Sequence, residues 1–179
     1  MSTDALNTDI GAEETPHISV AGDEARKRLS KHLAGATSDT YMLMAKTQGY
    51  HWNVAGPLFV SIHELTEEQY KDLFDAADDL AERIRALGER APGGYREFAE
   101  HTAVEDDDGT PKTAKEMVET LAHDNEKLAR RMKAASDVAE ELGDKVSEDM
   151  LIDRMQTHEQ NAWMLRAIAA DESRTGSRH

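Results

Sequence analysis

The stretch HWNVAGPLFVSIHELTEEQY, residues 51–70, places the dipeptide Gly56-Pro57 between two segments whose apolar residues recur at helical spacing. Glycine and proline end helices and begin turns, so this dipeptide predicts a chain reversal between two antiparallel helices. His51 lies five residues before Gly56, and His63 lies six residues after Pro57. At ~1.5 Å of rise per residue, the two imidazoles are expected at similar depth, facing one another.

Four long helical patterns extend outward from this turn. Apolar residues follow a helical period from Asp23 to the turn, through residues 61–87, from Thr113 to Leu142, and from Met150 to Ile168. Ser61 with Glu64, and Thr113 with Glu116, have the spacing of capping boxes, in which side chains satisfy the first backbone N–H groups of a helix. The segment GDKVSED, residues 143–149, is expected to separate the last two helices.

The connection between the second and third helices is too long for a hairpin. It begins at Gly88, contains a short helical pattern from Tyr95 and continues into the exposed acidic turn EDDDGTP. Four long helices with one long crossover in the middle is the ferritin-like arrangement, and no strand pattern competes with it. We therefore expect one ferritin-like four-helix bundle over residues 22–171, flanked by flexible tails at 1–21 and 172–179.

The composition limits which partners and chemistries the chain supports. It contains no cysteine among its 179 residues, so any metal ion must be held by nitrogen and oxygen ligands. A net charge of −15 repels nucleic-acid phosphates, so direct DNA binding is not expected, although an ordinary acidic surface has the same composition. This acidity would also suit a very salty cytoplasm. We find no apolar run long enough to cross a bilayer and no basic start of a signal peptide, which predicts a cytoplasmic protein.

Two pairs of ligand-type residues share one stripe of the second helix. His63 and Glu67 are four residues apart, and so are Asp78 and Glu82. At ~100° per residue, all four lie within about 100° of arc. Glu67 and Asp78 are eleven residues apart, or roughly 16 Å along the helix axis, so a single chain cannot bring both pairs to one metal ion.

A two-fold dimer would bring the pairs together. An antiparallel copy of the helix, crossing near residue 72, sets His63 against Glu82 and Glu67 against Asp78. With the histidine of the first helix, each of two identical sites then has two imidazoles and three carboxylates, a set that suits ferrous iron cycling to ferric. None of the predicted helices contains Glu-x-x-His, the motif of di-iron sites within one bundle, which also favours an interface.

The same residues also have structural interpretations. A lone histidine near a helix end more often caps or packs than binds a metal, and acids four residues apart usually form a solvated face. The spacing therefore leaves open both a metal site and a plain structural bundle with a polar stripe.

YHWNVAGPLFVSIHE, residues 50–64, followed by DAADDLAERIRALG, residues 75–88, resembles the signature of the Dps family, the small ferritin-like proteins of starved cells. MVETLAHDNE, residues 117–126, and SEDMLIDRMQTHEQNAWMLRA, residues 147–167, resemble the corresponding segments of the third and fourth helices. The resemblance thus covers most of the predicted bundle. It implies a hollow dodecameric shell of identical subunits, with a ferroxidase centre at each two-fold interface.

By this resemblance, the iron ligands are His51, His63 and Glu67 of one subunit with Asp78 and Glu82 of its partner. Many members have aspartate at the position of Glu67. The implied reaction oxidises Fe²⁺ to Fe³⁺, preferably with hydrogen peroxide rather than dioxygen. Ferric mineral is then stored in the shell cavity, which protects the cell against oxidative damage.

Further residues gain roles from the resemblance. Trp52 resembles the family's tryptophan near the centre, a sink for stray oxidising equivalents, and it also suits packing at the dimer interface. Acids that face the cavity nucleate mineral, and the candidates are Glu64, Glu68, Asp72, Asp75 and Asp79. Acids near the start of the last helix line iron-entry pores, with Asp149 and Glu141 as candidates. Asp149 also suits a favourable interaction with the helix N-terminus.

Members that condense DNA generally do so with lysine-rich flexible tails. Here the chain has no lysine or arginine before Arg26, and its first residues include acids at positions 4, 9, 13 and 14. A non-catalytic DNA-binding coat protein is therefore the alternative function, and the tail composition argues against it.

Overall fold

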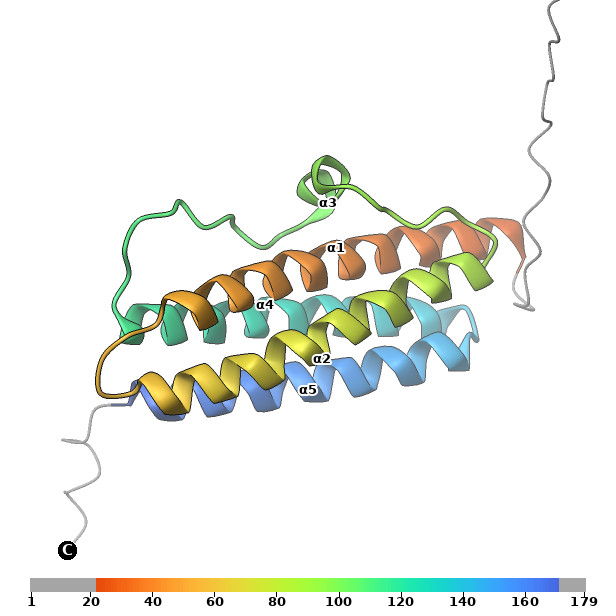
Figure 1. Cartoon of the computed structure of the whole chain (residues 1–179). Helices are drawn as coiled ribbons and strands as arrows, with labels where there is room; N and C mark the ends of the chain where they lie inside the picture. The colour runs from red at the N-terminus through yellow and green to blue at the C-terminus, as the bar shows by residue number, and fades with distance from the viewer. Residues whose placement is uncertain (1–21, 171–179) are drawn as a thin grey trace, which may run out of the picture.

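The computed structural model of the chain describes residues 22–170, which form four long helices and a short one (Figure 1). They are α1 (Asp23–Asn53), α2 (Phe59–Ala86), α3 (Tyr95–His101), α4 (Ala114–Glu141) and α5 (Lys145–Ala169). No strand occurs among the described residues, so the predicted all-α bundle with a short helix in its crossover is confirmed. The two predicted tails, residues 1–21 and 172–179, lie outside the described residues.

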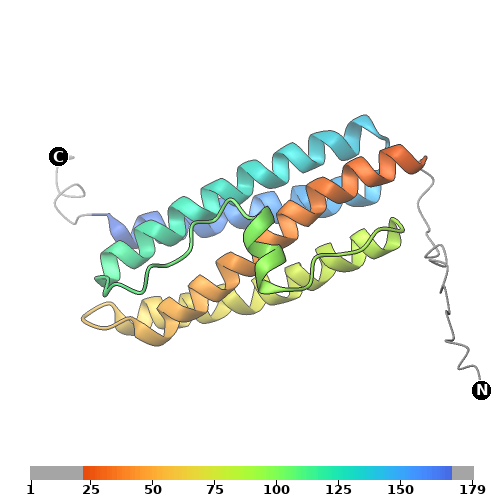
Figure 2. The ribbon, with the colours of Figure 1, turned by 90° about the horizontal axis from the view of Figure 1, so that it is seen from above.

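The long helices pack as two antiparallel hairpins. α1 and α2 lie side by side as one hairpin, and α4 and α5 form the other (Figures 1 and 2). α1 also packs along α4, which joins the hairpins, whereas α2 has few contacts with α4 and α5. The crossover passes over α1, where α3 lies, on its way to the start of α4 (Figure 2). One long face of α2 therefore stays exposed to solvent.

The first hairpin turns at Gly56, whose φ of 104° lies in the region that glycine adopts without strain. The next helix starts earlier than the sequence predicts, at Phe59. The Ser61 hydroxyl donates a hydrogen bond to the Leu58 carbonyl oxygen at 3.0 Å, and no side chain caps α2. The predicted capping box of Ser61 and Glu64 is therefore wrong, because both residues already lie inside the helix.

The second hairpin agrees with the sequence at its first helix and differs at its turn. Thr113 and Glu116 form the predicted capping box at the start of α4. The break before α5 is shorter than the predicted residues 143–149. The Asp144 carboxylate accepts a hydrogen bond from the Ser147 N–H, which allows α5 to begin directly after the aspartate.

Two buried ion pairs stabilise contacts between the hairpins. The ammonium of Lys46 in α1 lies 2.6 Å from the carboxylate of Asp124 in α4, and Arg83 of α2 binds both carboxylate oxygens of Asp144. Removing one partner of such a pair would leave an uncompensated charge inside the bundle. Two clusters of apolar side chains fill the rest of the interior. Within residues 22–170, no helix has the length and hydropathy that crossing a membrane requires.

Asp39 attaches the crossover to the bundle. Its buried carboxylate accepts a hydrogen bond from Thr102 at 2.8 Å and binds Arg131 of α4 at 2.7 Å. Nearby, the ring of Phe98 in α3 stacks on Tyr41 of α1 with 4.4 Å between the ring centroids. These contacts keep the crossover on α1, so that it does not cover α2.

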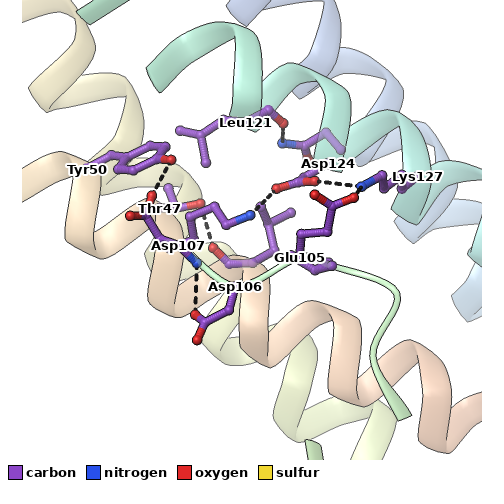
Figure 3. Close-up of polar contacts among 12 residues, drawn as sticks. Thr47, Tyr50, Glu105, Asp106, Asp107, Leu121, Asp124 and Lys127 are labelled. Carbon is purple, nitrogen blue, oxygen red and sulfur yellow. Dashed lines mark hydrogen bonds and ion pairs between the residues drawn. The ribbon is translucent and has the colours of Figure 1, made fainter. Parts of the chain in front are cut away.

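The acidic segment of the crossover packs onto α1 and α4 (Figure 3). The Tyr50 hydroxyl donates a hydrogen bond to Asp107, and burial together with this carboxylate raises the pKa of the Tyr50 phenol. Lys127 of α4 lies 3.4 Å from Glu105 and 3.5 Å from Asp124. The prediction of an exposed acidic turn is therefore wrong for Asp107, which is half-buried and holds the segment on α1.

His158 of α5 is fully buried and neutral. Its Nδ1 lies 2.9 Å from the side-chain oxygen of Asn125, whose amide nitrogen already donates to the Leu121 carbonyl. The Asn125 oxygen can only accept, so Nδ1 carries the hydrogen. Burial, with a smaller contribution from Arg154, lowers the pKa of His158 to about 3. Protonation therefore requires the bundle to open.

We expect the free energy of unfolding to fall as the pH drops below about 6.5, because the unfolded chain then binds a proton on His158 that the folded chain does not bind. Between pH 6.5 and 5.5 this one group accounts for about 1 kcal/mol per subunit. Urea unfolding at fixed protein concentration measures the effect, with His158→Gln as a control that cannot titrate. Equal pH dependence in both proteins would contradict the prediction.

Candidate metal centre

The two histidines of the first hairpin lie against each other. His51 is in the last turn of α1 and His63 is near the start of α2, on either side of the turn at Gly56. Their rings stack with 3.8 Å between centroids and 16° between planes. The sequence prediction that these imidazoles face one another is confirmed.

Reciprocal hydrogen bonds fix the tautomer of both rings. Nδ1 of His51 lies 2.9 Å from the carbonyl oxygen of His63, and Nδ1 of His63 lies 3.0 Å from the carbonyl oxygen of His51. A carbonyl oxygen only accepts, so each Nδ1 must be protonated and donate. In the neutral rings, both Nε2 atoms therefore keep a free lone pair, which is the state in which imidazole binds a metal ion.

Two further rings enclose the pair. Phe59 stacks on His63 with 4.9 Å between centroids, and Tyr70 meets His51 edge-on at 5.2 Å. The sequence alone predicted no role for either ring. The four-residue spacing of Phe59 and His63 on one helix was the available signal. These contacts leave the imidazoles little freedom to rotate.

Glu67 follows His63 by one turn of α2 and is charged. Lys71 donates a hydrogen bond to its carboxylate, and this bond is the main cause that lowers the pKa of Glu67. The carboxylate is therefore ionised, and in the single chain it is held by Lys71 one turn further along α2.

The other two predicted ligands lie on the same face of α2 but further along it. Asp78 and Glu82 are exposed, and neither forms a hydrogen bond or ion pair with another residue among 22–170. Helical rise separates Asp78 from Glu67 by roughly 16 Å. Accordingly, within the described residues no three histidine, aspartate or glutamate side chains form a group that could hold a metal ion. One chain thus presents the predicted ligands as two separate half-sites.

Comparisons with known proteins show the family of the chain. Residues 30–175 match the ferritin-like domain family. A DNA protection during starvation protein of Helicobacter pylori is 34% identical, over 78% of this chain and 95% of that protein. The chain belongs to the Dps family of ferritin-like proteins. An uncharacterized low temperature-induced protein of Nostoc sp. is 36% identical, over 86% of this chain and 87% of its own length.

A solved Dps structure has the same fold. The crystal structure of Dps from Staphylococcus aureus superposes with a TM-score of 0.79 at 30% sequence identity, covering 85% of this chain and 99% of that one. The similarity therefore spans most of the chain, and the family match over residues 30–175 includes the hairpin that holds the two histidines.

The other residues to which the Dps resemblance gives a role differ in how exposed they are and in what they contact. Trp52 is 67% exposed beside His51, so its ring is available to a neighbouring molecule and does not pack in its own bundle. Four of the five nucleation candidates are exposed on α2: Glu64, Glu68, Asp75 and Asp79. The fifth, Asp72, is bound through both oxygens by Arg154 of α5, at 3.0 and 2.7 Å.

The two pore candidates also differ. Asp149 is exposed near the start of α5, as expected. Glu141 is the last residue of α4, and both its oxygens bind Arg28 of α1 at 2.9 and 2.7 Å. An ion pair of this kind neutralises the carboxylate, so Glu141 is a weaker candidate for attracting cations than Asp149.

The hydrogen bonds at the hairpin predict that two substitutions of His63 separate its structural role from its ligand role. His63→Asn keeps an N–H donor near the position of Nδ1, so we expect the free energy of unfolding to stay within about 0.5 kcal/mol. His63→Leu loses the bond to the His51 carbonyl and should cost about 1 kcal/mol. Both variants lack Nε2 and should lose anaerobic Fe²⁺ binding in calorimetric titrations. An asparagine variant that binds Fe²⁺ like the wild type would contradict the ligand role.

Proposed function

We propose that this protein oxidises ferrous iron and stores the ferric product, using di-iron centres formed between two copies of the chain. The observation that carries the proposal is the hairpin pair His51 and His63, locked as Nδ1–H tautomers with both Nε2 lone pairs free. His63 shares one face of α2 with three carboxylates, those of Glu67, Asp78 and Glu82, which one chain cannot bring together. Histidine and carboxylate ligands together suit iron in both oxidation states.

The charges on α2 support a two-fold arrangement. In an antiparallel copy that crosses near residue 72, Glu67 lies opposite Asp78 of the partner subunit, and the two imidazoles lie near Glu82 of the partner subunit. Carboxylates this close repel one another unless a cation lies between them. Bound ferrous ions supply that positive charge, and the lone pairs of both Nε2 atoms complete the ligand set.

The chemistry follows from the substrates. Two ferrous ions each give up one electron, and hydrogen peroxide accepts the two electrons and two protons to form two water molecules. Transferring both electrons to one peroxide avoids release of a hydroxyl radical. The carboxylates favour the ferric state because hard oxygen ligands stabilise the higher charge. Dioxygen is the second candidate oxidant.

Assembly and storage complete the proposal. We propose that twelve copies form a closed shell whose cavity holds the ferric mineral, as the Dps relationship suggests. Exposed acids of α2 are the proposed nucleation residues, and Asp149 is the proposed pore residue. Trp52, exposed beside the centre, is the proposed sink for stray oxidising equivalents.

Mixing two inactive variants tests whether the centre lies between subunits. His51→Asn/His63→Asn removes one half-site, and Asp78→Ala/Glu82→Ala removes the other. Each variant alone should accelerate ferrous oxidation by peroxide no more than protein-free buffer does. Random co-assembly of equal amounts makes half of the two-fold dimers mixed, and each mixed dimer has one intact centre of two. The mixture should therefore recover about one quarter of the wild-type rate.

Stopped-flow absorbance of the ferric product, after anaerobic loading with Fe²⁺, measures these rates. The controls are each variant dissociated and reassembled alone, and the wild type treated in the same way. A site confined within one chain predicts no recovery at all in the mixture. That outcome would show that the centre is not intersubunit.

We also predict that the assembled protein does not retain DNA. With −15 per chain, a shell of twelve carries about −180, twelve times that value, and it repels phosphate at physiological salt. A gel-shift titration with labelled duplex should show no complex at any protein concentration that keeps the shell soluble. Retention of the duplex that weakens with salt would favour the alternative, a DNA-binding coat.

A further inference from the structure

Phe74 is a large apolar residue in the middle of the metal-ligand face. It follows Glu67 by seven residues and precedes Asp78 by four, so it lies on the same stripe of α2 between the two half-sites. Its side chain is 62% exposed. Phe59 and Val60 at the start of α2 are exposed as well, whereas the other apolar residues from Ile62 to Ala86 are buried or half-buried. An aromatic side chain in this position loses favourable burial unless something covers it.

A hollow lies directly beside Phe74. It has a volume of about 500 Å³ and lies between α1 and α2. Phe74 forms part of its rim, and the other lining residues are Met44, Gln48, Tyr70, Lys71 and Asp75. Apolar stems and a tyrosine ring make up most of this lining, which suits an aromatic ring more than an ion or a sugar.

The register of the two-fold centre brings this ring and this hollow together. An antiparallel copy crossing near residue 72 sets each Phe74 opposite Lys71 of the partner subunit, and each Tyr70 opposite Asp75 of the partner subunit. We propose that Phe74 of each chain inserts into the hollow of the other chain, and that this pair of contacts sets the register of the di-iron centre. The inference rests on the proposed function, which supplies the register.

The residues around the hollow fit this occupant. Lys71 lines the hollow and its ammonium is held by Glu67, so an inserted phenyl ring would lie close to a positive group that can interact with its face. Tyr70 touches both the hollow and the ring of His51. An inserted Phe74 therefore packs against the side chains that position the metal ligands.

A second copy of this chain fits better than any other partner. A two-fold interface needs a surface that is complementary to itself, and here the protruding ring and the hollow share one face of α2. The acids Asp78 and Glu82 lie beyond the ring on one side, and the imidazoles lie beyond it on the other side. An antiparallel copy pairs these unlike ends, whereas a slip of one helical turn would displace the ligands by ~5.4 Å.

Two variants test the insertion from opposite sides. Phe74→Ala removes the ring, and Gln48→Trp fills the hollow from its own chain while leaving Phe74 in place. Both should keep the helical circular dichroism of the wild type, because both sites lie at the surface of the bundle. Both should weaken the two-fold association roughly 10-fold or more, as loss of a central aromatic anchor does. Phe74→Leu, which still fills the hollow, should recover most of the assembly.

Analytical ultracentrifugation reports the association, and peroxide-driven oxidation of Fe²⁺ reports the centre. A Phe74→Ala protein that assembles like the wild type would overturn the proposal. So would a Gln48→Trp protein that assembles normally while Phe74→Ala dissociates, because the ring would then pack elsewhere. If the wild type fails to oxidise Fe²⁺, the proposed function fails. Sedimentation of the variants would still test whether Phe74 inserts into the hollow of the other chain.

Discussion

The straightness of α2 is the constraint on which the proposed chemistry depends. A helix that rises ~1.5 Å per residue keeps His63 and Glu67 roughly 16 Å or more from Asp78 and Glu82, however well the chain folds. No side chain can cross that separation. The fold therefore keeps the two half-sites apart along one straight helix. The proposed centre forms only where α2 of a second chain lies antiparallel to it. Catalysis of this kind is a property of the interface between chains.

The hairpin shows that the structural and the metal-binding interpretations of the histidines do not compete. The carbonyl of His51 lies in the last turn of α1, where helix carbonyls lack partners, and His63 satisfies it. The same kind of bond runs from His51 to the carbonyl of His63. Donating a hydrogen bond to either carbonyl requires hydrogen on Nδ1, which in the neutral ring leaves Nε2 unprotonated. The bonds that stabilise the turn thus prepare the ligands.

Local patterns in the sequence were enough to predict the helices and to predict that His51 and His63 face each other. Both predictions rest on spacing along a helix, which depends only on neighbouring residues. They failed at Ser61, where a hydroxyl bonds back to the Leu58 carbonyl and does not cap the helix. They also failed at Asp107, whose partner Tyr50 is distant in sequence. A contact such as that between Tyr50 and Asp107 depends on how the helices and the crossover pack, so no local periodicity in the sequence indicates it. The role of Phe74 likewise needed the hollow beside it, which α1 and α2 form together.

The distribution of acids links metal binding to assembly. Inside the bundle, Asp124 and Asp144 are each paired with a cation, so these charges are compensated before any second chain arrives. Asp78 and Glu82 are not paired within residues 22–170. The proposed two-fold register sets them near Glu67 of the partner subunit. Without a cation, this contact opposes association. With ferrous iron bound, it favours association. In the proposed centre, the free energy by which iron strengthens the interface equals the free energy by which the interface strengthens iron binding. The proposal therefore makes metal loading and shell assembly one coupled equilibrium.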